Sequence, residues 1–225
     1  MGVSYAANTA VVRTGEERLT LIRRTYSLVF ASVLVTIGGV AVGFTQPQLM
    51  DAVGAHPFIS FLIVLAPLFA ASRLDTTFPA NVGFMFLFTF IMGLWLSPVL
   101  FFFNRTQPGV IGEAALLTGS TFGVLTLYAF VSRRDFSAWG GFFIVGLWVL
   151  IGASLINLFV QSASADLYLA AVTVFIFSGL LVFRTWQIRN VYGPDQYVPA
   201  AISIYMALIN LFLAILRIVG GGRRS

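Results

Sequence analysis

Long apolar stretches separated by short polar breaks run through almost the whole chain. A helix needs roughly 20 apolar residues to cross a hydrocarbon layer of about 30 Å, and stretches close to this length recur. None of them shows the alternating polarity of a strand. The pattern predicts an all-α, polytopic membrane protein built as a bundle of seven transmembrane helices. The seven runs are residues 26–44, 57–71, 78–103, 109–131, 136–160, 167–186 and 198–219.

These runs divide the chain into three parts. We expect an amino-terminal tail over residues 1–25, a membrane domain over residues 26–220 and a short basic tail over residues 221–225. The second run is short and contains Pro67, and the third contains Pro98. Because proline removes a helical hydrogen bond, we expect both helices to be kinked or partly unwound.

Two pairs of glycines have the spacing of close helix packing. Gly39 and Gly43 lie in the first run, and Gly119 and Gly123 lie in the fourth. Small residues four positions apart let two helix backbones approach to van der Waals contact. Both pairs therefore predict tight helix–helix interfaces.

Composition supports a membrane protein. Of the 225 residues, 59% are hydrophobic and only 9% are charged, so the apolar surface exceeds what a soluble core needs. The formal net charge is +5, but the 13 basic residues are all arginines at the ends of apolar runs. Such arginines orient helices in a bilayer, so we expect lipid and not nucleic acid as the surrounding partner.

Counting arginines on alternate sides of the layer predicts the orientation. Nine fall on one side and four on the other if the seventh run crosses fully, which places the amino terminus in the cytoplasm. A re-entrant seventh run is the alternative. The complete lack of lysine and the compact length favour a bacterial inner membrane, and we expect no cleaved signal peptide. The two groups are Arg13, Arg18, Arg23, Arg24, Arg73, Arg133, Arg134, Arg184 and Arg189, against Arg105, Arg217, Arg223 and Arg224.

The sequence offers few residues that could carry out catalysis. The chain has no cysteine, which excludes disulfides and thiol catalysis, and its one histidine is His56. No nucleophile turn and no phosphate-binding glycine loop is present. The sequence therefore predicts no enzyme activity, no metal site and no cofactor.

Polar groups inside or beside the apolar runs are the remaining candidates. An ionised side chain at the bilayer centre costs ~2.5 to 3.5 kcal/mol on insertion scales, so such residues are functional candidates. These are Arg73, Glu113, Asn157, Arg184 and Asn210. The two arginines lie close enough to run ends to extend to the interface, and that is the alternative for each.

The last two runs resemble the carboxyl-terminal signature of the Bax inhibitor family, also called the transmembrane Bax inhibitor motif family. The stretch that carries the resemblance is FRTWQIRNVYGPDQYVPAAISIYMALINLFLAILRIVGG. Weaker similarity extends it over residues 23–220. The matching positions are Thr185, Ser203, Tyr205, Ile209, Asn210, Leu211, Phe212, Leu216 and Arg217.

This resemblance implies a seven-helix fold with the last helix in the centre. Some bacterial members act as pH-sensitive calcium leak channels, gated by two aspartates that an arginine bridges, and others are linked to a membrane protease and to stress protection. Carried onto this chain, the bridging residue is Arg73, and the two aspartate positions fall on Arg184 and Ala207. Neither of these is acidic.

The departure changes the charge of the implied gate. Two ionised aspartates and one arginine sum to −1, whereas Arg73, Arg184 and Ala207 sum to +2. Two like charges about 8 Å apart repel by roughly 2 kcal/mol at an effective dielectric constant of about 20. Calcium needs anionic or carbonyl oxygens as ligands, so we expect it to bind poorly at these three positions. The loop carboxylates Asp75 and Asp135 and also Asp195 are candidates to neutralise the arginines.

Two functional hypotheses follow. In the first, the chain is an ion leak channel or transporter of the Bax inhibitor type without the pH and calcium gate. In the second, it is a non-transporting membrane regulator that binds other membrane proteins, such as a protease or stress complex. The candidate pathway residues are Arg73, Glu113, Arg184, Ala207 and Asn210.

Overall fold

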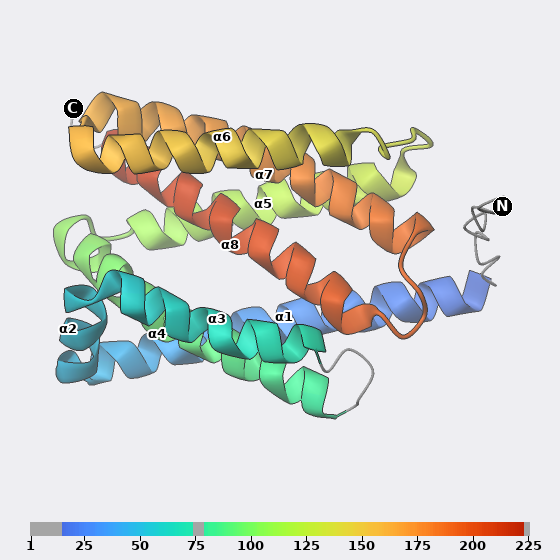
Figure 1. Ribbon diagram of the computed structural model, residues 1–225, viewed down its shortest axis with the longest axis horizontal. Coiled ribbons are helices and arrows are strands. Elements are labelled where there is room, and N and C mark those ends of the chain that lie inside the picture. Colours follow the sequence, from blue (N-terminus) through green and yellow to red (C-terminus); the bar gives the residue numbers. More distant parts are fainter. Residues whose placement is uncertain (1–14, 74–78, 223–225) are drawn as a thin grey trace, which may run out of the picture.

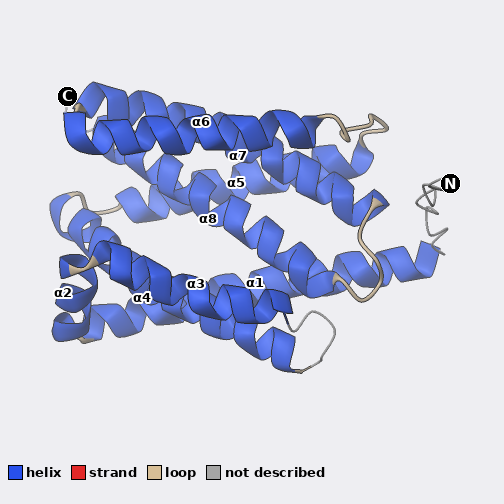
Figure 2. Cartoon of the chain, viewed as in Figure 1, coloured by secondary structure: helices blue, strands red, loops and turns tan. Residues whose placement is uncertain are grey.

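The computed structural model describes residues 15–73 and 79–222, and this part of the chain folds into eight α-helices (Figure 1). Short loops join them, and no strand occurs among the described residues (Figure 2). The side chains of residues 57, 58, 70–73 and 222 are not described. The helices are α1 (Gly15–Thr45), α2 (Pro47–Ala55), α3 (Pro57–Arg73), α4 (Ala80–Thr106), α5 (Val110–Val131), α6 (Trp139–Val160), α7 (Ala163–Asn190) and α8 (Tyr197–Gly222).

Six of these helices are each long and apolar enough to cross a membrane, and α2 with α3 makes a seventh candidate if this bent pair is one span. The two segments of that span meet at an angle of 98°. Pro57 explains the break, because the residue before a proline is pushed out of the helical region. His56 accordingly has φ −128° and ψ 62° and ends α2. The multipass, all-α prediction is confirmed.

Three local features differ from the sequence-based expectation. The first helix begins at Gly15, so residues 15–25 of the expected amino-terminal tail are helical. The short helix α2 falls in what we expected to be a loop. Both proline-containing runs stay helical, α3 through Pro67 and α4 through Pro98.

The last helix occupies the centre of the bundle. It packs against α1, α4, α5 and α7, and its spanning segment is 44% buried, the largest share among the six spanning helices. Helix α3 packs on the outside against α4, and α6 packs on the outside against α7 (Figure 1). The central position that the family resemblance implies is therefore confirmed.

Contacts between distant residues assign the helix ends to two sides. Arg18 of α1 donates from Nε to the carbonyl of Arg189 in α7 at 2.9 Å, and the Arg24 guanidinium lies 5.7 Å from the ring of Tyr197 at the start of α8. We call this side the arginine-rich end. At the opposite end, Gln107 donates to the carbonyl of Gly220 at 3.0 Å. Helix α8 thus runs fully from one end to the other.

Glycines bring α1 and α4 into backbone contact. A Cβ on Gly39 would collide with the carbonyl oxygen of Phe90, and a Cβ on Gly93 would collide with that of Thr36. Gly43 is similarly covered by the side chain of Ser97. The first predicted glycine pair is therefore confirmed as a helix interface.

The second glycine pair behaves differently. A Cβ on Gly119 or on Gly123 would meet no atom within 4 Å, so the prediction of close packing there is wrong. Spacing alone places two small residues on one face of a helix, but it does not say whether another helix covers that face.

Candidate functional site

A row of buried hydroxyl groups follows one face of α1. Thr25, Ser32 and Thr36 are seven and four residues apart, which places them on one side of a helix. All three are buried, and they face the interior of the bundle where α8 lies. We call these residues the hydroxyl row.

Thr36, the last residue of the hydroxyl row, joins three helices. Thr36 Oγ1 lies 2.7 Å from the Tyr205 hydroxyl of α8, 2.8 Å from the carbonyl of Ser32 and 3.1 Å from the carbonyl of Thr89 in α4. Because a hydroxyl carries one proton, the arrangement is satisfied when Tyr205 donates to Thr36 and Thr36 donates to one of the carbonyls. The Phe88 ring packs edge-on against Tyr205, with 5.8 Å between centroids.

The other two hydroxyls of the row have no such partner. Within the described residues, Thr25 Oγ1 and Ser32 Oγ are buried and make no hydrogen bond. A helical serine or threonine can usually bond to the carbonyl one turn earlier. An unsatisfied buried hydroxyl costs about 1–3 kcal/mol, so these two groups lower the stability of the bundle.

A second hydroxyl contact lies nearer the arginine-rich end. The hydroxyls of Tyr26 and Thr185 lie 3.0 Å apart and join α1 to α7. The Tyr26 ring packs between Phe122 and Phe130 of α5, at centroid distances of 6.1 and 5.8 Å. This cluster lies beside Thr25, at the arginine-rich end of the hydroxyl row.

Arg184, the most prominent predicted candidate, is held by its own helix. It is half-buried, its Nη1 donates to Gln187 Oε1 at 2.8 Å, and its guanidinium carbon lies 5.7 Å from the ring centroid of Phe183. Asp135, one of the carboxylates suggested as its neutralising partner, accepts from the backbone N–H of Ser137 at 2.8 Å. Both contacts of Arg184 are with uncharged groups.

The remaining predicted residues lie apart. Ala207 is 4% exposed in the main hydrophobic core, and Asn210 donates to the carbonyl of Met206 one turn earlier in α8. Glu113 is exposed in the first turn of α5. Arg73 ends α3, and its side chain, like the whole of Asp75, lies outside the described residues. The described residues thus do not form one charged centre.

Arg189 has a structural role that the sequence did not suggest. Its Nη1 lies 3.3, 2.8 and 3.0 Å from the carbonyl oxygens of Ala129, Phe130 and Ser132 at the end of α5. Carbonyls in the last turn of a helix lack helical partners and carry partial negative charge, so a guanidinium there is stabilising. Its position in the last turn of α7 was visible in the sequence, but the acceptor helix was not.

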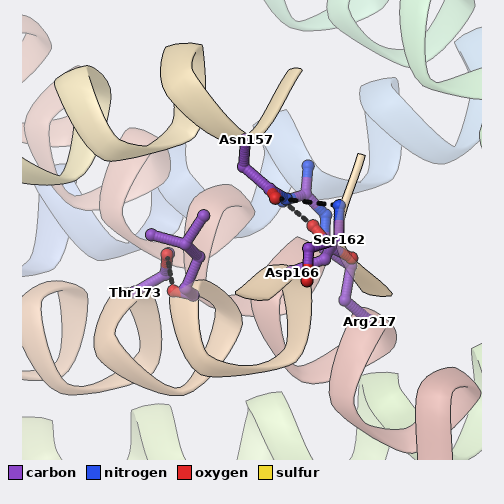
Figure 3. Close-up of polar contacts among 6 residues, drawn as sticks. Asn157, Ser162, Asp166, Thr173 and Arg217 are labelled. Atoms are coloured by element: carbon purple, nitrogen blue, oxygen red, sulfur yellow. Dashed lines mark hydrogen bonds and ion pairs between the residues drawn. The ribbon is translucent and has the colours of Figure 1, made fainter. Parts of the chain in front are cut away.

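The end opposite the arginine-rich end carries a polar cleft between α6, α7 and α8 (Figure 3). Its volume is about 310 Å³. Asn157 Oδ1 accepts from the backbone N–H of Ser162 at 3.2 Å, and Arg217 pairs with Asp166 at 3.7 Å. Asn157 therefore acts as a helix-end cap, and the exposed ion pair contributes little to stability.

Within the described ranges, no group of three or more histidine, cysteine, aspartate or glutamate side chains lies close enough to hold a metal ion. Calcium sites need several oxygen ligands, among which carboxylates predominate. The interior offers hydroxyls and backbone carbonyls instead.

Comparisons with known proteins show which family the chain belongs to. A family model described as "Inhibitor of apoptosis-promoting Bax1" matches residues 18–224. Bax inhibitor 1 of Schizosaccharomyces pombe is 34% identical over 209 residues, which are 90% of this chain and 77% of the relative. Mouse protein lifeguard 4 is 32% identical, with 89% and 84% covered. An uncharacterized membrane protein of Vibrio cholerae is 36% identical, with 75% and 78% covered. On this similarity along nearly its full length, the chain belongs to the Bax inhibitor family.

Proposed function

We propose that this member of the Bax inhibitor family is an ion leak channel or transporter that is not controlled by protons or calcium. The observation that carries the proposal is the chemistry at the two implied gate positions. Arg184 binds the amide oxygen of Gln187, and Ala207 lies buried in the apolar core. Neither position supplies a carboxylate that could change its charge between pH 5 and pH 8 or bind a hard dication. We therefore propose a transport role and no enzymatic one.

Flux measurements test this proposal. The purified chain is reconstituted in liposomes loaded with dyes for calcium, potassium or chloride, and flux is followed at pH 6 and pH 8. We expect no pH-dependent calcium flux, and a leak of a monovalent ion that is equal at the two pH values. A calcium flux that changes with pH would contradict the proposal.

A gain-of-function variant sharpens the test. The double substitution Arg184→Asp with Ala207→Asp restores the two carboxylates, and we expect a pH-dependent calcium leak to appear. The single variant Ala207→Asp is the matched control, because it adds one carboxylate and keeps Arg184. If the double variant inserts and folds but stays silent, the implied gate positions do not line the pathway.

We further propose that the protein lies in a bacterial inner membrane with the arginine-rich end in the cytoplasm. Arginines gather at the start of α1, in the α5–α6 loop and at the end of α7, as the positive-inside rule requires. The cysteine-free chain allows a direct test by single cysteines. In intact cells, an impermeant maleimide should label Ser164→Cys, at the other end, but not Ser137→Cys in the α5–α6 loop. The reverse pattern would contradict the orientation.

A membrane regulator is the second candidate, and the outer surface of α6 favours it. The spanning segment of α6 is only 11% buried, and large side chains such as Trp148 and Phe159 are exposed on it. A protein partner could cover this face within the bilayer. Cross-linking in native membranes should then give a reproducible adduct from Trp148→Cys and none from an exposed position on α3 such as Leu62→Cys. A monodisperse protein with no reproducible adduct would contradict this role.

A further inference from the structure

An apolar groove separates α1 and α5 over part of their length. The two helices touch near the arginine-rich end, where the Tyr26 ring packs between Phe122 and Phe130. Toward the other end, a cavity of about 380 Å³ lies between them. Helices α4 and α8 form its floor, since both contribute lining side chains. We call this cavity the α1–α5 groove.

The walls of the groove accept only hydrocarbon. None of its lining residues is charged, and the hydroxyls among them belong to Thr36 and Thr118. Thr118 Oγ1 donates to the carbonyl of Ala114 at 2.6 Å, and Thr36 is bonded to Tyr205. A polar guest would have to break these bonds or lose its own hydrogen bonds to water, which costs several kcal/mol in an apolar site. The groove therefore favours a guest without polar atoms.

The length of the groove and its position along the bundle match one leaflet of a bilayer. Along α5 it runs from Ile111 to Gly119, which is about 12 Å of helix. One leaflet has about 15 Å of hydrocarbon, half of the ~30 Å layer. Ile111 is the second residue of α5, so the groove begins at the end opposite the arginine-rich end. Its position is that of the acyl chains of the leaflet on that side.

The groove is open to the surrounding lipid. Ile37 on its α1 side is 59% exposed, and Ala115 and Gly119 on its α5 side are exposed. Because Gly119 has no side chain and a Cβ there would meet nothing within 4 Å, the α5 wall is recessed at this point. We propose that the α1–α5 groove binds one acyl chain of a phospholipid from this leaflet, and that the chain packs against Thr36 beside its bond to Tyr205.

Lipid retention in detergent tests the proposal, since detergent removes lipids that only surround the protein. The full chain is reconstituted with phosphatidylglycerol that carries a diazirine in mid-chain, and it is then extracted in mild detergent. The mass of the extracted protein with its bound lipid is measured by native mass spectrometry. We expect one phospholipid to remain per protein copy. After irradiation, adducts should map to Ile37, Ala115 and Gly119 and not to Leu116, which is 75% exposed on the adjoining face of α5.

Two matched variants complete the experiment. Ala115→Phe fills the groove, whereas Leu116→Phe places the same aromatic side chain on the outer face of the same helix. Ala115→Phe should lower lipid retention by about tenfold, equivalent to about 1.4 kcal/mol of binding free energy, and Leu116→Phe should leave it unchanged. Equal retention in the two variants would overturn the proposal, as would adducts spread evenly over α5.

If Ala115→Phe fails to fold, the positions of the lipid adducts on the unmodified chain test the proposal instead. Adducts confined to the groove residues support an acyl chain there. A species with the mass of two protein copies and no lipid adduct at Ile37 or Ala115 would instead identify a second copy of the chain as the occupant and refute the proposal.

Discussion

Replacing Gly39 by alanine tests whether α1 and α4 are held at backbone contact, and Gly38→Ala is its matched control. A Cβ on Gly39 would collide with the carbonyl oxygen of Phe90 and lie 3.1 Å from the Cα of Gly93. A Cβ on Gly38 would meet nothing within 4 Å. Both substitutions gain about 1 kcal/mol of helix propensity, so this term cancels in the comparison.

The cost that remains belongs to Gly39→Ala alone. Overpacking a tight contact typically costs about 1–3 kcal/mol. Moving the helices apart by about 0.5–1 Å forfeits a quarter to a half of the local dispersion energy. The hydrogen bond between Thr36 and Tyr205 lies one turn away in α1, and weakening it adds about 0.5–1.5 kcal/mol. We therefore expect Gly39→Ala to unfold with about 2–4 kcal/mol less free energy than Gly38→Ala.

The assay is reversible unfolding in mixed micelles. The purified variants are titrated with sodium dodecyl sulfate, and loss of tertiary structure is followed by near-ultraviolet circular dichroism. The two free energies of unfolding are compared under the same conditions. If they agree within about 0.5 kcal/mol, the spread of a neutral substitution, the close approach of α1 and α4 does not contribute to stability and the reasoning fails.

Three further predictions have defined outcomes in the same unfolding assay. Gly119→Ala should be neutral or up to about 1 kcal/mol stabilising, because its Cβ meets no atom within 4 Å, and a clear loss of stability would show a contact there. Tyr205→Phe and Thr36→Val should each cost about 0.5–1.5 kcal/mol and should not be additive in a double-mutant cycle, whereas full additivity would rule out their hydrogen bond. Arg189→Gln should cost about 1–3 kcal/mol through the carbonyls at the end of α5, and an equal effect from the exposed Arg133→Gln would disprove that role.

Hydropathy predicted the spanning helices well because the bilayer imposes both their length and their composition. It could not place the start of α1. Glu16 and Glu17 in its first turn are favourable at a helix amino terminus but unfavourable in hydrocarbon, so a helix that extends beyond the membrane looks like a tail on a hydropathy scale. The nine-residue α2 was missed because it is too short to give a spanning signal, although Pro47 at its start was a helix-initiating residue.

Pairwise contacts were less predictable than elements. Two glycine pairs with the same spacing had different surroundings, since α4 covers Gly39 and Gly43 while no helix covers Gly119. The spacing of the hydroxyl row could have been read from the sequence, but its partner Tyr205 is more than 160 residues away along the chain. Its charge made Arg184 the most prominent candidate in the sequence. In the structure, the buried polar contacts of the interior involve neutral hydroxyls.

The central position of α8 bears on how the protein is made. It follows α1 to α7 along the chain, so the ribosome delivers it after them, although α1, α4, α5 and α7 all pack against it. Until it inserts, the hydroxyl of Thr36 lacks Tyr205 and the buried faces of those four helices border lipid. The seven earlier helices therefore form an incomplete assembly in the membrane until α8 joins them.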